Sequence, residues 1–289
     1  MEYSSVRSLR KDRRAVSPAI SMVIMTAAVI VMVLVAMAYA NTFLGSRLAE
    51  NEFSTNKQFM RSTALQIDDI AWTIGRTQTV RYSSQYGNMK FQNSTVTYTV
   101  RVDRGSGVFD TNPLVTVTTG IIMFNMPVNS YSVTNNYFER VLPSYGNSFL
   151  QVGPTATVSQ VFCVENLPMA DGNYIRVVAV PSVRRLDTKI AGSAGSSTNY
   201  TKFYLPSLVD RGDHPYLSQS ITMTSSDVLK SLENGVDRVQ ITVSFPNATS
   251  GFDNNDFFRF DNVNEIVTLI PNSIVEFYIG TVVVTVGKV

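Results

Sequence analysis

The sequence contains very little of the cysteine, histidine and charge on which metal sites, many enzymes and disulfide-bonded domains depend. Its 289 residues include one cysteine and one histidine, and 16% of them are charged. A single cysteine cannot form an intrachain disulfide, so packing must stabilise the fold. Cys163 lies in the apolar run 161–164 and is expected to be a small buried side chain. His214, between Asp213 and Pro215, is expected in a surface loop.

Motifs of catalysis are missing from the sequence as well. It has no Gly-x-Ser-x-Gly elbow, no glycine-rich phosphate loop and no pair of cysteines or histidines at metal-binding spacing. Asp253, Asp256 and Asp261 could offer oxygen ligands to calcium, but they lack the alternation of an EF-hand loop, and solvated turn residues are the favoured interpretation. We therefore expect no enzymatic activity, no cofactor and no metal.

Charge is nearly balanced over the chain and is concentrated at one end. The 24 basic and 22 acidic residues give a net charge of +2, and the first 14 residues alone carry five basic and two acidic side chains. The rest of the chain is close to neutral, which argues against a nucleic-acid partner.

One long apolar segment follows this basic leader. Residues 15–40, AVSPAISMVIMTAAVIVMVLVAMAYA, contain no charged side chain. These 26 residues would form a helix of roughly 39 Å, enough to cross a bilayer core of about 30 Å. The basic leader would remain in the cytoplasm under the positive-inside rule. A secretory signal has a shorter apolar region that precedes its cleavage site, whereas the basic and small residues here precede the apolar region.

The junction Arg13-Arg14-Ala15-Val16-Ser17-Pro18-Ala19-Ile20 resembles the class III signal peptides of archaeal type IV pilins. The resemblance covers residues 10 to about 45. It implies that a prepilin peptidase cleaves after Ala15, or after Arg14, at a site formed by the four residues Arg13, Arg14, Ala15 and Val16. It further implies assembly into a surface filament with other pilin subunits, driven by an assembly ATPase and a platform protein.

Two departures from relatives of that family are visible. The segment 15–40 lacks the glutamate that bacterial pilins carry near the start of the mature helix, and it lacks the glycine-rich start of archaellins. The alternative is an uncleaved signal anchor that holds a non-polymerising extracellular binding domain. Pro18 favours the cleaved form, because proline is tolerated in the first turn of a helix and interrupts one that starts further upstream.

A long helix is expected to run from residue 16 to residue 74. Its part 16–43 is apolar all round and is assigned to the membrane or the filament core, and its part 44–74 is amphipathic. One face of the second part carries apolar residues at spacings of seven, four, three, four and three, namely Phe53, Met60, Ala64, Ile67, Ala71 and Ile74. Gly75 is a plausible terminator.

Short strands without a helical pattern between them are expected to fill residues 75–289, outside the cell. Residues 95–102 and 238–245 alternate polar with apolar side chains, as half-buried antiparallel strands do. Further strands are expected at 114–118, 121–126, 157–164, 174–180, 221–224, 274–279 and 282–286. The predicted fold is α+β, a long helix followed by an antiparallel β-sandwich head. The small-residue stretch 191–198 is either a loop or, near 191–200, a boundary between two β units.

Surface chemistry is better represented than catalysis. Asn93, Asn199 and Asn247 begin sequons for N-glycosylation, which would make the protein a glycoprotein outside the cytoplasm. A loop region rich in proline, asparagine and serine carries Tyr131, Tyr137, Phe138 and Tyr145. These rings either form an adhesion surface, with surface glycans among its potential partners, or cover an edge of the sandwich.

Overall fold

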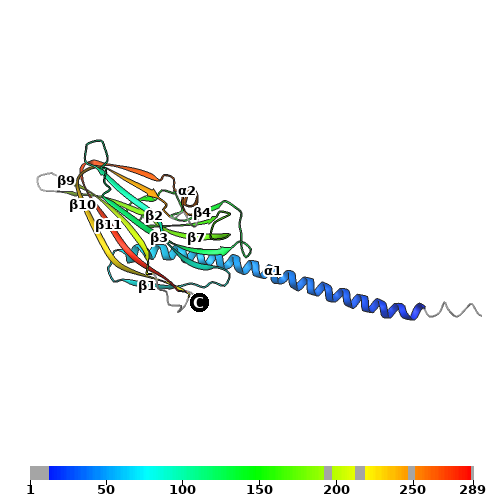
Figure 1. Ribbon diagram of the computed structural model, residues 1–289. Coiled ribbons are helices and arrows are strands. Elements are labelled where there is room, and N and C mark those ends of the chain that lie inside the picture. The colour runs from blue at the N-terminus through cyan, green and yellow to red at the C-terminus, as the bar shows by residue number, and fades with distance from the viewer. Residues whose placement is uncertain (1–12, 192–196, 212–218, 247–250, 288–289) are drawn as a thin grey trace, which may run out of the picture. The chain divides into compact units, whose positions relative to one another are not determined.

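The computed structural model describes residues 13–191, 197–211, 219–246 and 251–287 (Figure 1). The chain divides into an N-terminal unit, Met1–Ala49, and a head unit, Glu50–Val289. The described elements are two helices and eleven strands: α1 (Arg13–Ala71), β1 (Thr77–Arg81), β2 (Asn88–Asp103), β3 (Val115–Pro127), β4 (Tyr137–Leu142), β5 (Leu150–Val152), β6 (Ser159–Glu165), β7 (Tyr174–Pro181), β8 (Val183–Ala191), β9 (Ser197–Asp210), β10 (Ser220–Ser244), α2 (Asn255–Phe258) and β11 (Asn264–Gly287). The fold is α+β, as predicted.

Helix α1 ends three residues earlier than expected, and the three described residues before the expected start at 16 are already helical. The helix continues through Pro18, at the cost of one backbone hydrogen bond, so this proline does not mark the start of α1. The helix stops at Ala71 because the chain turns there to meet the sheet. Gly75 has φ +82°, a conformation that favours glycine, and its N–H donates to the carbonyl of Ser225 at 2.8 Å.

The described strands form one hydrogen-bonded sheet, in the order β4-β6-β7-β3-β2-β10-β11-β9-β8-β5, with β1 paired to β10. Among the described strands, only the pairs β9–β11 and β5–β8 are parallel. Figure 1 shows β10 and β11 as the long pair coloured yellow to red, and most of the other strands extend the sheet from either side of this pair. The two separate sheets of a sandwich are therefore not confirmed in this part of the chain, and a single large, mostly antiparallel sheet is found.

The core draws side chains from both halves of this sheet. Strands β2, β3, β6 and β7 contribute to the same buried cluster as β9, β10 and β11. Tyr98 of β2 is fully buried in it, and its hydroxyl donates to the carbonyl of Pro181 at 2.6 Å. Phe203 and Phe277, on neighbouring strands, stack with ring centroids 4.6 Å apart. The sheet therefore encloses its own core.

Several predicted strands are parts of longer ones. The segments 114–118 and 121–126 are joined in β3, and 274–279 and 282–286 are joined in β11. The joins are Thr119-Gly120 and Gly280-Thr281. Gly280 keeps its pairing partners on β10 and β9, whereas Gly120 lies where a bulge in β2 shifts the register of the β2–β3 pair. The stretch 191–198 connects β8 to β9, which pair directly with each other from Arg184↔Tyr204 to Ala191↔Ser197. Its central residues, 192–196, lie outside the described ones.

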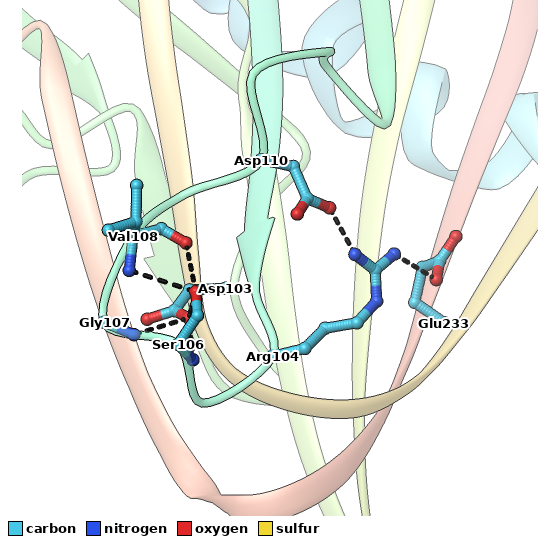
Figure 2. Close-up of polar contacts among 7 residues, drawn as sticks. All are labelled: Asp103, Arg104, Ser106, Gly107, Val108, Asp110 and Glu233. Atoms are coloured by element: carbon cyan, nitrogen blue, oxygen red, sulfur yellow. Dashed lines mark hydrogen bonds and ion pairs between the residues drawn. The ribbon is translucent and has the colours of Figure 1, made fainter.

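The loop between β2 and β3 is held to β10 by ionic contacts (Figure 2). Asp103, at the end of β2, accepts hydrogen bonds from the backbone N–H groups of Ser106 and Gly107. Arg238 of β10 also donates to this carboxylate and lowers its pKa. Arg104 pairs with both Asp110 in the loop and Glu233 on β10. These contacts hold the β2–β3 loop against the end of the sheet.

Candidate functional site

The first candidate site is the apolar stretch of α1 in the N-terminal unit. Every residue from Ile20 to Leu44 is exposed, and none of them is charged. Burial of one Val, Leu or Ile side chain is worth about 1.5–3 kcal/mol, so a bare helix of this composition is unfavourable in water. By length and composition the helix can cross a membrane, a property that signal sequences share. This stretch needs lipid or protein around it.

Two hydroxyl groups in this stretch bond to the helix itself. Thr26 Oγ1 donates to the carbonyl of Met22 at 2.8 Å, and Thr42 Oγ1 donates to the carbonyl of Ala38 at 3.0 Å. A hydroxyl that is satisfied inside its own helix can enter an apolar environment at little cost. These contacts therefore suit a helix surrounded by lipid or by other apolar helices.

The residues of the expected processing site lie at the start of the described part of α1. Arg13, Arg14, Ala15 and Val16 are helical, and Pro18 follows within the same helix. Their side chains lie outside the described ones. Cleavage at this site stays a prediction.

The second candidate site lies within the head unit, where residues 50–71 of α1 contact the sheet. The predicted apolar stripe is buried there, with Met60, Ile67 and Ala71 at 0% exposure. Ile74 is the exception, because it follows the end of the helix and is 64% exposed. Where the helix crosses β11, a Cβ at Gly280 would lie 2.3 Å from the Ala71 carbonyl oxygen, so glycine is needed for this close approach.

A carboxylate fixes the other end of this contact. Glu52 accepts hydrogen bonds from the backbone N–H groups of Gln85, Tyr86 and Gly87, at 2.8–3.1 Å. The hydroxyl of Ser84 donates to the same carboxylate at 2.7 Å. The loop between β1 and β2 is thereby closed around one helix residue. Because these partners lie more than 30 positions away in the chain, the sequence offers no local signal for them.

Lys57 links the middle of the helix to β4. Its Nζ donates to Glu139 at 2.6 Å, and the hydroxyl of Tyr137 donates to the other carboxylate oxygen at 2.6 Å. Burial alone would raise the pKa of Glu139, but the hydrogen bonds from Lys57 and Tyr137 outweigh it, so the pKa is lowered. Burial and the Glu139 carboxylate both raise the pKa of Tyr137. The carboxylate form is therefore the one that this site stabilises.

The end of α1 contacts β8 through Asp68 and β9 through Trp72, the residue that follows the helix. Its indole N–H donates to Asp68 at 2.8 Å, and its ring meets that of Tyr204 edge-on with centroids 5.2 Å apart. Asp68 also forms an ion pair with Arg184, at 2.6 Å. The only tryptophan of the chain thus lies in the contact between helix and sheet.

A row of four side chains continues from this point across four strands. Arg184, Tyr204, Tyr278 and Lys230 are direct neighbours on β8, β9, β11 and β10. The two tyrosine rings stack 5.0 Å apart, and each has one of the two cations within 5.5 Å of its centroid. Cation–π and stacking contacts of this kind reinforce strand pairing. The sequence could not reveal the row, because strand order and register bring its members together.

The four aromatic residues predicted as an adhesion surface lie in different environments. Tyr131 packs against Phe53 of α1, with centroids 5.2 Å apart, and Tyr137 bonds to Glu139. Phe138 packs against the core and stacks on Phe162. Tyr145 is 70% exposed. Tyr145 is therefore the member of the set most available to a ligand, and adhesion through the set stays a prediction.

Two of the three predicted sequons fall on described strands. Asn93 is exposed at a bulge in β2, but the hydroxyl of Thr95 is buried and donates to the carbonyl of Gln92. Asn199 lies on β9, and the hydroxyl of Thr201 donates to Asp187. The third sequon, at Asn247, lies outside the described residues, and glycosylation stays a prediction for all three.

The remaining candidate residues from the sequence analysis are the cysteine, the histidine and the aspartates considered for calcium. Cys163 is buried, and burial raises the pKa of its thiol to about 12. Of the three aspartates considered for calcium, Asp256 lies in the first turn of α2, and the Asp261 carboxylate accepts from the N–H of Asn147. No three His, Cys, Asp or Glu side chains among the described residues are grouped to hold a metal ion. His214 lies outside the described residues.

Comparison with known proteins gives no relative for this chain. No protein-family model, no curated protein and no solved structure matches it.

Proposed function

We propose that this chain is a type IV pilin-like structural subunit of an archaeal surface filament, with an adhesive or minor-subunit role. One observation carries the proposal. Within a single helix, an exposed and uncharged stretch from Ile20 to Leu44 precedes a buried stripe that packs on the chain's own sheet. A filament subunit needs both parts, one to join its neighbours and one to hold its head.

Assembly is the proposed mechanism. The apolar stretch lies in membrane lipid until a filament motor extracts it, and it then packs against the equivalent stretches of other subunits. At about 25 cal/mol per Å² of apolar surface, such burial can hold a filament together without covalent links. The prepilin peptidase, the assembly ATPase and the platform protein are partners that follow from the resemblance of the leader.

The location follows from the same mechanism. Before processing, the basic leader remains in the cytoplasm and the helix crosses the membrane. Afterwards, the head is part of a filament or of the cell surface, where the sequons would carry glycans. The head is proposed as the adhesive part, because it is far larger than the helix contact requires.

A non-polymerising membrane anchor is the second candidate. The observation that favours it is the exposure of residues 20–44 on all sides, which suits lipid as well as it suits neighbouring helices. In that case the head would be a binding domain held singly at the outer face of the membrane.

Two measurements separate the candidates. N-terminal sequencing of protein from the cell surface is expected to find a mature chain that begins at Val16. Electron microscopy of cells with and without this protein is expected to show filaments that depend on it. An intact leader together with unchanged filaments would contradict the pilin-like function and support the anchor.

A matched pair of variants tests the leader. Arg13→Gln combined with Arg14→Gln leaves the apolar helix intact and removes the basic pair of the processing site. We expect uncleaved, membrane-bound protein and no filaments. Arg10→Gln combined with Lys11→Gln removes the same charge further from the site and is expected to be processed normally.

A further inference from the structure

A cleft in the head unit lies between α1 and the two loops that flank β5. Its volume is about 390 Å³, within the range of about 300–1,000 Å³ that small-molecule sites occupy. It is lined by Arg61, Val141, Leu142, Pro143, Ser144, Tyr145, Gln151, Thr155 and Thr157.

The charge of this lining is positive. Arg61 is its only charged residue, and its guanidinium group makes no hydrogen bond or ion pair within the described part of the chain. Two other cations near the helix are paired, Lys57 with Glu139 and Arg184 with Asp68. Arg61 is thus an exposed cation that the fold leaves for another partner, and that partner is expected to be an anion.

The remaining lining suits a sugar. Tyr145 is 70% exposed, and its ring contacts no other aromatic ring among the described residues. Ser144 and Thr155 add hydroxyl groups to the same cleft. Thr157 donates its hydroxyl hydrogen to the carbonyl of Ser159, which leaves the oxygen as an acceptor. An open ring face beside several hydroxyls matches a pyranose, which has apolar C–H faces and polar edges.

We propose that this cleft binds an acidic sugar residue that carries a carboxylate. The guanidinium of Arg61 holds the carboxylate in the paired geometry that arginine provides. The ring of Tyr145 supports the sugar, and the hydroxyls of the cleft bond to its edge. The inference deepens the proposed adhesive role, because polysaccharides with such residues are met at cell surfaces, and binding itself requires no filament.

The test uses the full chain in detergent micelles and isothermal titration calorimetry. The probes are a galacturonic acid trisaccharide, the neutral galactose trisaccharide and inorganic sulfate. We expect the acidic trisaccharide to bind more tightly than either of the others. Arg61→Gln should weaken this binding about tenfold or more, as expected for loss of a charge-assisted pair. Arg61→Lys should retain part of it, and Tyr145→Ala should weaken it as well.

Arg81→Gln is the matched control, because Arg81 is an exposed cation on β1 outside the cleft. This variant should bind the acidic trisaccharide as tightly as the wild type does. Equal binding of the acidic and neutral sugars, or unchanged binding after Arg61→Gln, would overturn the inference. Sulfate that binds as well as the acidic sugar, with no effect of Tyr145→Ala, would reduce the cleft to a simple anion site and also overturn it. If binding depends on Arg61 but cells form no filaments, the cleft stands and the pilin-like function fails.

Discussion

The buried stripe of α1 makes a quantitative prediction through two isoleucines of the same predicted face. Ile67 is 0% exposed, whereas Ile74 is 64% exposed. Truncation of a fully buried isoleucine to alanine removes its burial and leaves a cavity, at a cost of about 2–5 kcal/mol. We therefore expect Ile67→Ala to destabilise the head unit by about 3 kcal/mol and Ile74→Ala to have an effect within about 0.5 kcal/mol.

The measurement is thermal or denaturant unfolding of the full chain in detergent micelles, followed by tryptophan fluorescence. Trp72, the only tryptophan, lies in the contact between helix and sheet and reports its loss directly. In a unit of this size, 1 kcal/mol shifts Tm by about 2–4 °C, so Ile67→Ala should lower Tm by about 6–12 °C. Ile67→Val should cost only about 0.5–1.5 kcal/mol.

Equal effects of the two alanine variants would refute this reasoning. If Ile67→Ala unfolds like the wild type, the helix does not pack on the sheet and residues 50–71 form a free stalk. If Ile74→Ala costs as much as Ile67→Ala, the helix continues past Ala71 and the stripe remains buried to residue 74.

Three further predictions concern the head unit. Gly280→Ala should cost about 1–3 kcal/mol in the same unfolding assay, because its methyl group meets the end of α1. Gly45→Ala should not destabilise the chain, because its methyl group meets no atom of the described residues within 4 Å. The lowered pKa of Glu139 means that its pair with Lys57 stabilises the fold above the ordinary carboxyl pKa of 4.5 and is lost as the pH falls through the lowered value. Glu139→Gln should remove this part of the acid dependence in pH-dependent unfolding, and an unchanged profile would contradict it. Cys163 should not react with iodoacetamide at pH 8 until the chain is unfolded, as mass spectrometry of the alkylated protein can check, since burial raises the pKa of its thiol to about 12.

Local periodicity was sufficient to predict much of the fold. The alternation over 95–102 and 238–245 corresponds to the paired ends of β2 and β10. The helical spacing from Phe53 to Ala71 corresponds to a buried face. Such patterns are readable because each side chain's orientation follows from the backbone period alone.

The rest depends on contacts between distant parts of the chain. Ile74 fits the helical spacing and is exposed, because Gly75 joins Ser225 and so ends the helix before it. Thr77–Arg81 carries little apolar periodicity and becomes a strand by pairing with β10. The sequence does not distinguish Arg61 from other exposed helix cations. Only the fold shows that Arg61 and Tyr145 line the same cleft. In each case, strand register and topology determine the environment of the residue.

The length of the buried helix face has a mechanical consequence. From Phe53 to Ala71 it extends over about 27 Å, with Glu52 held at one end and Trp72 at the other. A pull along the axis of α1 would load these contacts together, in shear, and the force would be shared among them. A pull across the axis would break them one after another. The head should therefore resist tension transmitted along its helix far better than the same tension applied sideways.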